Sequence, residues 1–188
     1  MTSNRIPSPW VLEVIGRIEE SSPDLRVLDF ACGAGRHVEL LLERGHRVLA
    51  VDRDISGLAD LTSPGRLETL QFDLEIGASW PFSRERFKAV LVTNYLHRPT
   101  LDETIGLIAA RGVLIYETFG TGNERFGRPS NPAYLAKPGE IADHARELGF
   151  DVEIDRHMEI VSPRPAIVQR VLATNAMGQS DIRQNRPI

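Results

Sequence analysis

The stretch VLDFACGAGRHV, residues Val27–Val38, joins a short, mostly apolar run to a glycine-rich turn and then to a segment of helical periodicity. Short apolar runs that end in turn residues are typical of buried parallel strands. Glycines between a strand and a helix let the backbone approach a ligand closely, and the helix N-terminus presents unpaired N–H groups. This stretch therefore predicts a cofactor-binding unit of strand, turn and helix.

The same alternation of apolar runs and helical segments continues along most of the chain. We expect strands at 26–30, 47–51, 67–72, 88–93 and 112–118, and helices at 10–20, 36–44, 55–61, 101–110 and 138–148. Two further strand-like runs, at 151–161 and 166–174, are joined too tightly to be parallel to each other. The order predicts an α/β fold, with a doubly wound, mostly parallel seven-stranded sheet and a C-terminal antiparallel hairpin.

Length and composition indicate one ordinary globular domain. The 188 residues are 41% hydrophobic and 26% charged, with a net charge of −4. We expect a loose N-terminal arm over residues 1–9, a cofactor-binding domain over 10–174, and a disordered polar tail over 175–188.

Composition also limits the cellular compartment and the kinds of partner that we expect for this protein. No apolar run approaches the roughly 20 residues of a membrane span, and the single cysteine, Cys32, excludes an intrachain disulfide, so we expect a cytoplasmic protein. The acidic balance weighs against a nucleic-acid substrate without excluding one. The five histidines show no metal-ligand spacing, so we predict no metal, and the oligomeric state stays open.

Three acids mark the ends of three consecutive predicted strands: Asp29, Asp52 and Asp73. In open α/β sheets, ligands bind at the carboxyl ends of the strands. Asp52 is placed to accept hydrogen bonds from a ribose diol, and Asp73 from an adenine amino group. The three acids together predict a site for a nucleoside-type cofactor.

The residues around the turn distinguish between cofactors. The dinucleotide fingerprint G-x-G-x-x-G, begun at Gly33, needs a small residue at position 38, where Val38 stands. Asp29 would also repel a pyrophosphate, whereas an acid there suits a ligand with an ammonium group and a sulfonium. The sequence therefore favours S-adenosylmethionine (SAM) over NAD.

The segment DFACGAG resembles motif I of class I SAM-dependent methyltransferases, written (D/E)-x-G-x-G-x-G, with Ala31 in place of the first glycine. AVDRD, QFDLE and VLVTNYLHRP resemble the family's motifs at the next three strand ends, and the resemblance spans about residues 26–174. It implies a Rossmann-like methyltransferase fold and SAM as the cofactor. GAGRHVELLLERGHRVLAVDRD is further similar to the tellurite-resistance-type small-molecule methyltransferases, although no diagnostic substrate motif follows. Strand ends and resemblance together assign to the cofactor site Asp29, Ala31, Cys32, Gly33, Gly35, Asp52, Arg53, Asp73, Leu74, Asn94 and Tyr95.

Residues for the methyl acceptor are expected after the fourth and fifth strands. His97 is a candidate general base, with a loop carbonyl as its alternative partner. Glu117 is a candidate for orienting or deprotonating the acceptor, with structural pairing to Arg98 or Arg125 as the alternative. The sequence also suggests as substrate contacts Arg98, Arg125, Phe126 and Tyr134.

The loop of residues 120–140 is too long for a simple connector. Either it closes over the acceptor or it is a packed surface loop pinned by its prolines. Its arginines suit an anionic substrate and equally an RNA phosphate. Within the turn and helix, Cys32 is expected to be a small buried residue, and His37 to be exposed, with contact to the cofactor as the alternative.

The leading hypothesis is a SAM-dependent methyltransferase that acts on a small molecule by in-line displacement. Three alternatives remain: an RNA or protein methyltransferase that works with a partner, a non-catalytic SAM-binding scaffold domain, and an NAD-dependent reductase. The last is disfavoured by Asp29 and Val38. The tetrapeptide N/D-P-P-Y/F of amino-methylating enzymes is absent, since TNYL stands at that strand end.

Overall fold

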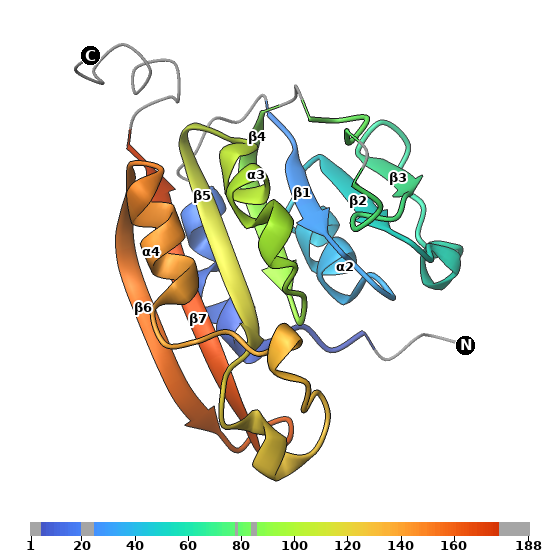
Figure 1. The fold of residues 1–188 in the computed structure, drawn as a ribbon. Coiled ribbons are helices and arrows are strands. Elements are labelled where there is room, and N and C mark those ends of the chain that lie inside the picture. The colour runs from blue at the N-terminus through green and yellow to red at the C-terminus, as the bar shows by residue number, and fades with distance from the viewer. Residues whose placement is uncertain (1–4, 20–24, 78, 84–85, 177–188) are drawn as a thin grey trace, which may run out of the picture.

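The computed structural model describes residues 5–19, 25–77, 79–83 and 86–176, and within them a seven-stranded sheet lies between two layers of helices (Figure 1). The strand order is β3-β2-β1-β4-β5-β7-β6. Pairing is parallel from β3 to β5, and β7 runs antiparallel to both β5 and β6. The predicted doubly wound sheet and its antiparallel C-terminal hairpin are confirmed.

The strands are β1 (Val27–Phe30), β2 (Val48–Asp52), β3 (Leu67–Gln71), β4 (Phe87–Thr93), β5 (Ile108–Phe119), β6 (Phe150–Ile160) and β7 (Ala166–Asn175). The α-helices are α1 (Pro9–Val14), α2 (Arg36–Glu43), α3 (Leu101–Gly106) and α4 (Glu140–Glu147). Short 3₁₀ helices are η1 (Ile15–Ile18), η2 (Ser56–Leu58), η3 (Arg98–Thr100), η4 (Asn123–Phe126) and η5 (Pro132–Tyr134).

The helices α1 and α2 lie on one face of the sheet, and α3 and α4 lie on the other (Figure 1). On one face, α1 and α2 bury residues such as Trp10 and Leu41 against alternate side chains of the central strands. On the other face, α3 and α4 bury residues such as Ile105 and Ile141 against the remaining side chains. Central strands that are covered on both faces are buried along their whole length, which is why β4 shows no alternation of buried and exposed residues.

Several predicted helices are shorter than expected. Residues 108–110 are predicted as the end of a helix but begin β5. The pairing of β4 with β5 shifts register between Phe87 and Ala89, opposite this segment. Arg111 takes a positive φ of 63° there. The predicted helix at 10–20 changes to 3₁₀ geometry at Ile15, and the one at 55–61 reduces to η2. A short run of apolar residues fits either a strand or a helix. For residues 108–110, pairing with β4 selects the strand.

Both ends of the described chain make specific contacts. Arg5, in the segment predicted to be loose, donates to the carbonyls of Ala34 at 2.8 Å and Gly57 at 2.7 Å, and it also pairs with Asp60. Asn175, predicted as the first residue of the tail, is the buried last residue of β7. The remainder of the predicted arm and tail, residues 1–4 and 177–188, lies outside the described residues. Among the described residues, no helix has the length and apolar character needed to cross a membrane.

Two glycines at the ends of α2 offer a matched stability test. Both have left-handed φ, 78° at Gly35 and 82° at Gly45, so alanine is strained at either position. A Cβ at Gly35 would overlap the buried side chain of Leu58, whereas a Cβ at Gly45 meets no atom within 4 Å. Gly35→Ala should therefore lower the free energy of unfolding by about 1–3 kcal/mol more than Gly45→Ala, measured by urea denaturation. Equal losses would contradict the close packing of η2 on the turn.

Candidate functional site

The carboxyl ends of β1, β2 and β4 meet at one edge of the sheet, where the chain leaves β1 through the glycine-rich turn. Ala31 and Gly33 take left-handed φ values of 57° and 54°. The Cys32 amide donates to the Val51 carbonyl at 3.0 Å, and the Gly33 amide donates to the Asp52 carboxylate at 2.8 Å. The turn is thus fixed to the end of β2, which keeps its backbone open toward the sheet edge.

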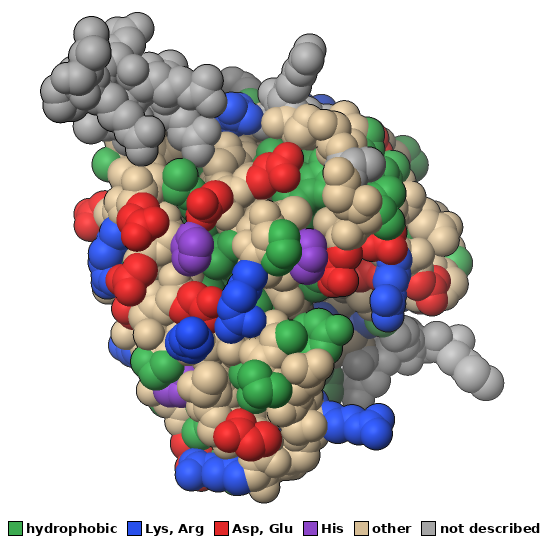
Figure 2. Space-filling model, in the orientation of Figure 1, with side chains coloured by type: hydrophobic (Ala, Val, Ile, Leu, Met, Phe, Trp, Pro, Cys, Tyr) green, Lys and Arg blue, Asp and Glu red, His purple; other side chains and the backbone are tan. Residues whose placement is uncertain are grey.

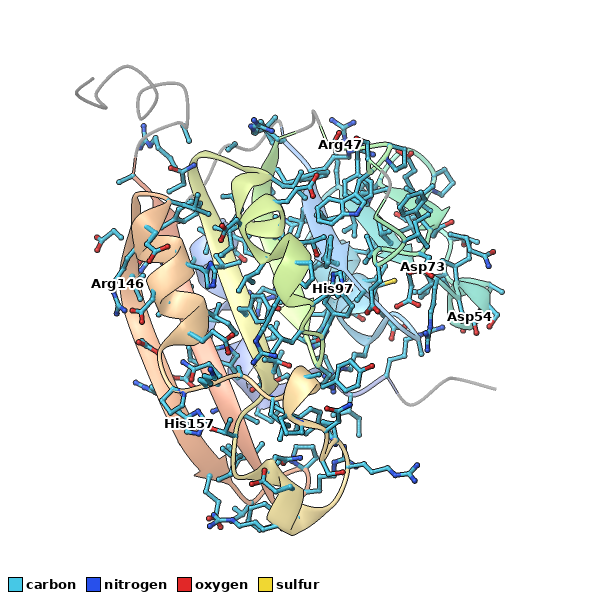
Figure 3. The ribbon with its side chains drawn as sticks, viewed as in Figure 1. Arg47, Asp54, Asp73, His97, Arg146 and His157 are labelled. Carbon is cyan, nitrogen blue, oxygen red and sulfur yellow. The ribbon has the colours of Figure 1, made fainter. Side chains whose placement is uncertain are left out.

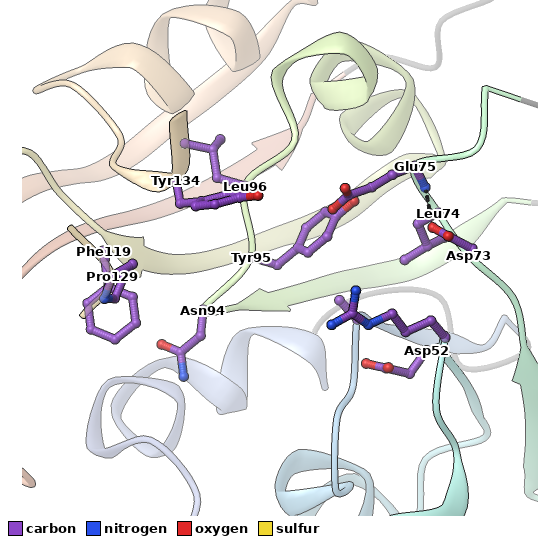
Figure 4. A pocket seen from close by; sticks show the side chains of 12 residues that line it. Asp52, Asp73, Leu74, Glu75, Asn94, Tyr95, Leu96, Phe119, Pro129 and Tyr134 are labelled. Atoms are coloured by element: carbon purple, nitrogen blue, oxygen red, sulfur yellow. Dashed lines mark hydrogen bonds between the residues drawn. The ribbon is translucent and has the colours of Figure 1, made fainter. Parts of the chain in front are cut away.

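A cavity of about 500 Å³, here called the strand-edge cavity, opens in front of this turn (Figure 4). Asp52 and Asp73 lie on one side, Asn94 and Phe119 on the other, and Tyr95 between them (Figure 4). Its full lining is Ala31, Asp52, Arg53, Asp73, Leu74, Glu75, Asn94, Tyr95, Leu96, Phe119, Pro129 and Tyr134.

Most of the residues predicted for the cofactor site come together in this cavity. The ones that do not line it are Asp29, Cys32, Gly33 and Gly35, which shape the turn behind it. Cys32 is buried against the α1–α2 core. Sequence reasoning missed four lining residues: Glu75, Leu96, Phe119 and Pro129. Glu75 and Leu96 stand in QFDLE and VLVTNYLHRP, and Pro129 stands in the loop of residues 120–140, all segments already singled out, but nothing local marks Phe119.

Asp29 is a fully buried carboxyl group, and neither of its oxygens has a hydrogen-bond partner among the described residues. Burial raises its pKa from 3.8 to about 7, Arg36 opposes that rise, and Asp52 adds to it. Such an orphaned carboxyl group behind the turn favours a cationic group nearby. The carboxylate acceptors in and behind the cavity therefore fit a ligand with an ammonium group, a diol and a planar base.

Tyr95 contributes a second orphaned polar group, because its hydroxyl is buried and no described residue meets hydrogen-bond geometry with it. Burial, together with the nearby carboxylates of Glu75 and Asp73, raises its pKa above the usual range. The hydroxyl therefore stays protonated and can donate a hydrogen bond to a ligand in the strand-edge cavity.

A second cavity of about 630 Å³, here called the arginine cavity, shares Asn94 and Phe119 with the first. Three guanidinium groups line it, those of Arg36, Arg164 and Arg170. The rest of its wall comes from the N-terminal segment, the ends of β5 and β7, and the β6–β7 turn: Ile6, Pro7, Ser8, Pro9, Glu117, Ile160, Ser162, Pro163, Ala166 and Val168.

Glu117 lies in the wall of the arginine cavity with both carboxylate oxygens engaged. One accepts from the Ser8 hydroxyl at 2.6 Å and the other from Arg170 Nε at 2.7 Å. The sequence alternative proposed that Glu117 pairs with Arg98 or Arg125. In the structure its partner is Arg170 instead. A carboxylate already bound on both oxygens is better suited to positioning than to proton transfer.

His37 extends this buried network to α2. It was expected to be exposed, but its side chain is only 1% exposed, and its Nε2 accepts from the Ser8 amide at 3.1 Å. Burial lowers the pKa of His37 to about 3, so the ring is neutral and can accept this hydrogen bond. Together, His37 and Glu117 hold Ser8, which places residues 6–9 over the arginine cavity.

His97 stands apart from the arginine cavity. It lines a third cavity of about 450 Å³ with Trp80 and Thr100, and its Nδ1 lies 3.0 Å from Thr100 Oγ1. Figure 3 shows His97 close below α3, on the side of Asp73. The third cavity adjoins the strand-edge cavity at Leu74 and Glu75, the side opposite Asn94 and Phe119. The geometry favours a local structural bond over general-base catalysis.

Arg98 is occupied by structural contacts. It pairs with Glu140, with Nη2 and Oε2 2.9 Å apart, and it donates to the carbonyls of Ala133 at 2.7 Å and Leu135 at 2.9 Å. It thereby attaches the long loop to α4, which leaves few donors for a substrate.

The other predicted substrate residues divide between the surface and the cavity wall. Arg125 pairs with Glu159 and stacks on Phe126 at 4.7 Å, away from both the strand-edge and arginine cavities. Tyr134 reaches the strand-edge cavity, as does Pro129 of the same loop. The loop of residues 120–140 therefore forms part of the cavity wall. Among the described residues, no group of three or more His, Cys, Asp or Glu side chains is arranged to hold a metal.

A sheet of this order with a cavity at the carboxyl ends of β1, β2 and β4 defines a Rossmann-like cofactor-binding protein. Residues 27–111 match the family described as a methyltransferase domain. A search of curated proteins found no match.

Solved structures share the fold at low sequence identity. The 1,6-didemethyltoxoflavin-N1-methyltransferase of Burkholderia thailandensis is 18% identical, with a TM-score of 0.64 over 89% of this chain and 76% of that one. A SAM-dependent methyltransferase from Mesorhizobium loti is 14% identical, with a TM-score of 0.64 over 89% and 98%. TehB from Haemophilus influenzae is 15% identical, with a TM-score of 0.60 over 87% and 61%.

Residues 27–111 therefore form a methyltransferase domain with the fold of the class I SAM-dependent methyltransferases, and the cofactor is S-adenosylmethionine. The resemblance of DFACGAG to motif I is confirmed at the level of this class.

The buried carboxyl group makes the stability of the ligand-free protein depend on pH. Because the folded pKa of Asp29, about 7, exceeds its ordinary value, the folded state binds this proton more tightly, and stability is lost as pH rises through that range. When the pH is raised from about 5 to about 8, Asp29→Asn should lose about 2–3 kcal/mol less of its free energy of unfolding, measured in urea, than the native protein does. The opposite contribution of His37, whose pKa is lowered, is common to both proteins and cancels. If the free energy of unfolding changed equally with pH in the native protein and in Asp29→Asn, burial would not raise the pKa of Asp29.

Proposed function

We propose that this protein transfers the methyl group of SAM to a small-molecule acceptor that binds in the arginine cavity. The observation that carries the proposal is the junction of two cavities, of about 500 and 630 Å³, at Asn94 and Phe119. Both volumes suit small ligands. One cavity carries the polar groups for the cofactor, and the other is bounded by different elements of the chain.

The residues of the strand-edge cavity would hold the cofactor in a defined direction. Asp52 would accept from the ribose hydroxyls, while Asp73, Leu74 and Tyr95 would contact the adenine. Asp29 would favour the ammonium group through its charge, since it lies behind Ala31 rather than at the cavity surface. Ala31 and Asn94 would then line the methionine end, next to the arginine cavity.

The cofactor supplies an activated methyl group: its sulfur–methyl bond breaks as the bond to the acceptor forms, which leaves S-adenosylhomocysteine and releases a proton if the acceptor atom carries one. The protein's contribution is alignment and exclusion of water. Phe119 and Asn94 would position the acceptor atom, and Ser8 holds the N-terminal segment over the cavity. Glu117 would act by orienting Arg170 and Ser8.

Surface charge supports a small acceptor over a nucleic acid. On the face shown in Figure 2, basic and acidic side chains are interspersed and form no basic stripe. Phosphate backbones are usually gripped by such a stripe. A protein of similar fold, from Burkholderia thailandensis, was solved with bound 1,6-didemethyltoxoflavin and S-adenosylhomocysteine, which illustrates how this architecture accommodates a small acceptor.

Asp52 offers a direct test of the cofactor site. Asp52→Asn should weaken S-adenosylhomocysteine binding at least about tenfold, because a neutral amide accepts poorly from two ribose hydroxyls. Asp54→Asn is the matched control: Asp54 lies on the same loop, is exposed, and does not line the cavity. Calorimetry gives both affinities, and melting temperatures without ligand separate binding from folding. Equal affinities in the two variants would remove Asp52 from the site.

The transferase activity is tested by S-adenosylhomocysteine release from SAM in the presence of small phenols, amines, thiols and carboxylic acids, with total RNA and total protein as comparison substrates. Acceptor-dependent release is expected with at least one small-molecule class. Release only with RNA or protein would contradict the small-molecule assignment. Tight SAM binding with no release across the whole panel would favour a non-catalytic SAM-binding domain.

A further inference from the structure

The arginine cavity carries an excess of positive charge beside an apolar wall. Its lining has three guanidinium groups, and Glu117 is the one carboxylate among the lining residues described. Asp29, whose carboxyl group interacts electrostatically with Arg36, does not line this cavity, and its pKa, raised by burial to about 7, leaves it partly protonated near neutral pH. The cavity therefore holds more cationic than anionic groups.

Two of the arginines belong to the same side of the cavity. In the β5–β7 pairing, Glu117 lies opposite Arg170 and Phe119 lies opposite Val168. Since alternate residues of a strand share a face, these four side chains point to one face of the sheet. Arg164, in the β6–β7 turn, has its guanidinium 5.6 Å from the centre of the Phe119 ring. Arg164 and Arg170 thus flank the same apolar surface.

The donors of these arginines are only partly used. Arg170 is almost buried, donates to Glu117 through Nε, and lies over the Trp10 ring at 5.4 Å. This fixes its plane, so its terminal nitrogens face a defined direction. Arg164 is exposed, and no ion pair holds it among the described residues. An oxyanion between the two would gain charge-assisted hydrogen bonds from both.

Arg36 is less diagnostic, because it follows the glycine turn directly and lines the arginine cavity near Asn94. Because Ala31 of the same turn would line the methionine end of the cofactor, Arg36 stands close in sequence to the cofactor as well as in the wall of the arginine cavity. Its charge can therefore serve the cofactor's own carboxylate, and the acceptor argument rests on Arg164 and Arg170.

We infer that the methyl acceptor is a small organic anion, whose carboxylate or similar oxyanion lies between Arg164 and Arg170 and whose apolar body packs on Phe119 and Val168. This inference rests on the proposed function. It places the anionic group away from the strand-edge cavity, so that the atom to be methylated faces Asn94. Recognition of the anion thereby orients the acceptor for transfer.

The test uses the full-length protein saturated with S-adenosylhomocysteine and pairs of probes that differ only in charge: benzoate and benzamide, phenylacetate and phenylacetamide, and 4-hydroxybenzoate and 4-hydroxybenzamide. Phenyl phosphate distinguishes a phosphate from a carboxylate preference. Calorimetry should show at least one anion binding about tenfold or more tightly than its neutral partner. No anion preference in any pair would overturn the inference.

The arginine assignment is tested by a graded series at the exposed position. Arg164→Gln should weaken anion binding by about fivefold to tenfold, and Arg164→Glu by more, while S-adenosylhomocysteine affinity changes less than about twofold. Arg44→Gln, at the opposite end of α2 from Arg36, makes the same charge change far from the cavity and is expected to match the native protein. Anion binding that is equally unaffected by the Arg164 and Arg44 changes would overturn the inference. The same titrations report S-adenosylhomocysteine binding: its failure contradicts the proposed function, whereas retained cofactor binding without an anion preference contradicts only the acceptor class.

Discussion

The parallel pairing of β1 between β2 and β4 is the constraint on which the site depends. Val27 pairs with Val48 on one side and with Ala89 on the other, so the three strands run in step. Their carboxyl ends therefore reach the same edge, and the turn after β1, Asp52 and Asn94 come together although they are far apart in the sequence. The apolar cores on both faces of the sheet hold this register, because a slip of one residue would exchange the two faces.

A second constraint is the buried network around Ser8, which joins three elements that no sequence motif connects. Ser8 bonds His37 of α2 and Glu117 of β5, and Glu117 in turn holds Arg170 of β7. A buried ion pair of this kind is a weak source of net stability, because desolvation offsets much of its attraction. Its contribution is geometric: it sets where the N-terminal segment lies and which way Arg170 points, and so it shapes the arginine cavity.

Local patterns predicted more of the lining of the strand-edge cavity than of the arginine cavity. Glycines, strand-end acids and apolar runs are short-range signals, and the strand-edge cavity is built from them, as Asp52, Asp73 and Asn94 show. The arginine cavity depends on contacts between distant segments. Ser8, Arg164 and Arg170 carry no local signal, and Arg98, which looked available in sequence, is bound to Glu140 across the loop. The start of β5 at Ile108 could not be predicted from the sequence either. Its residues suit a helix or a strand equally, and pairing with β4 selects the strand.

The sequence by itself determined the alternation of strands and helices, the glycine-rich turn at 31–35 and the choice of SAM over a dinucleotide, because backbone conformation, apolar periodicity and the charge of Asp29 act over a few residues. The tertiary structure alone decided the burial of His37, the pairing of Glu117 with Arg170 and the gathering of arginines beside Asn94. Hydrogen bonds and desolvation depend on which atoms meet in space. Those contacts form only when β7 lies between β5 and β6 and the N-terminal segment packs along the edge of the sheet (Figure 1).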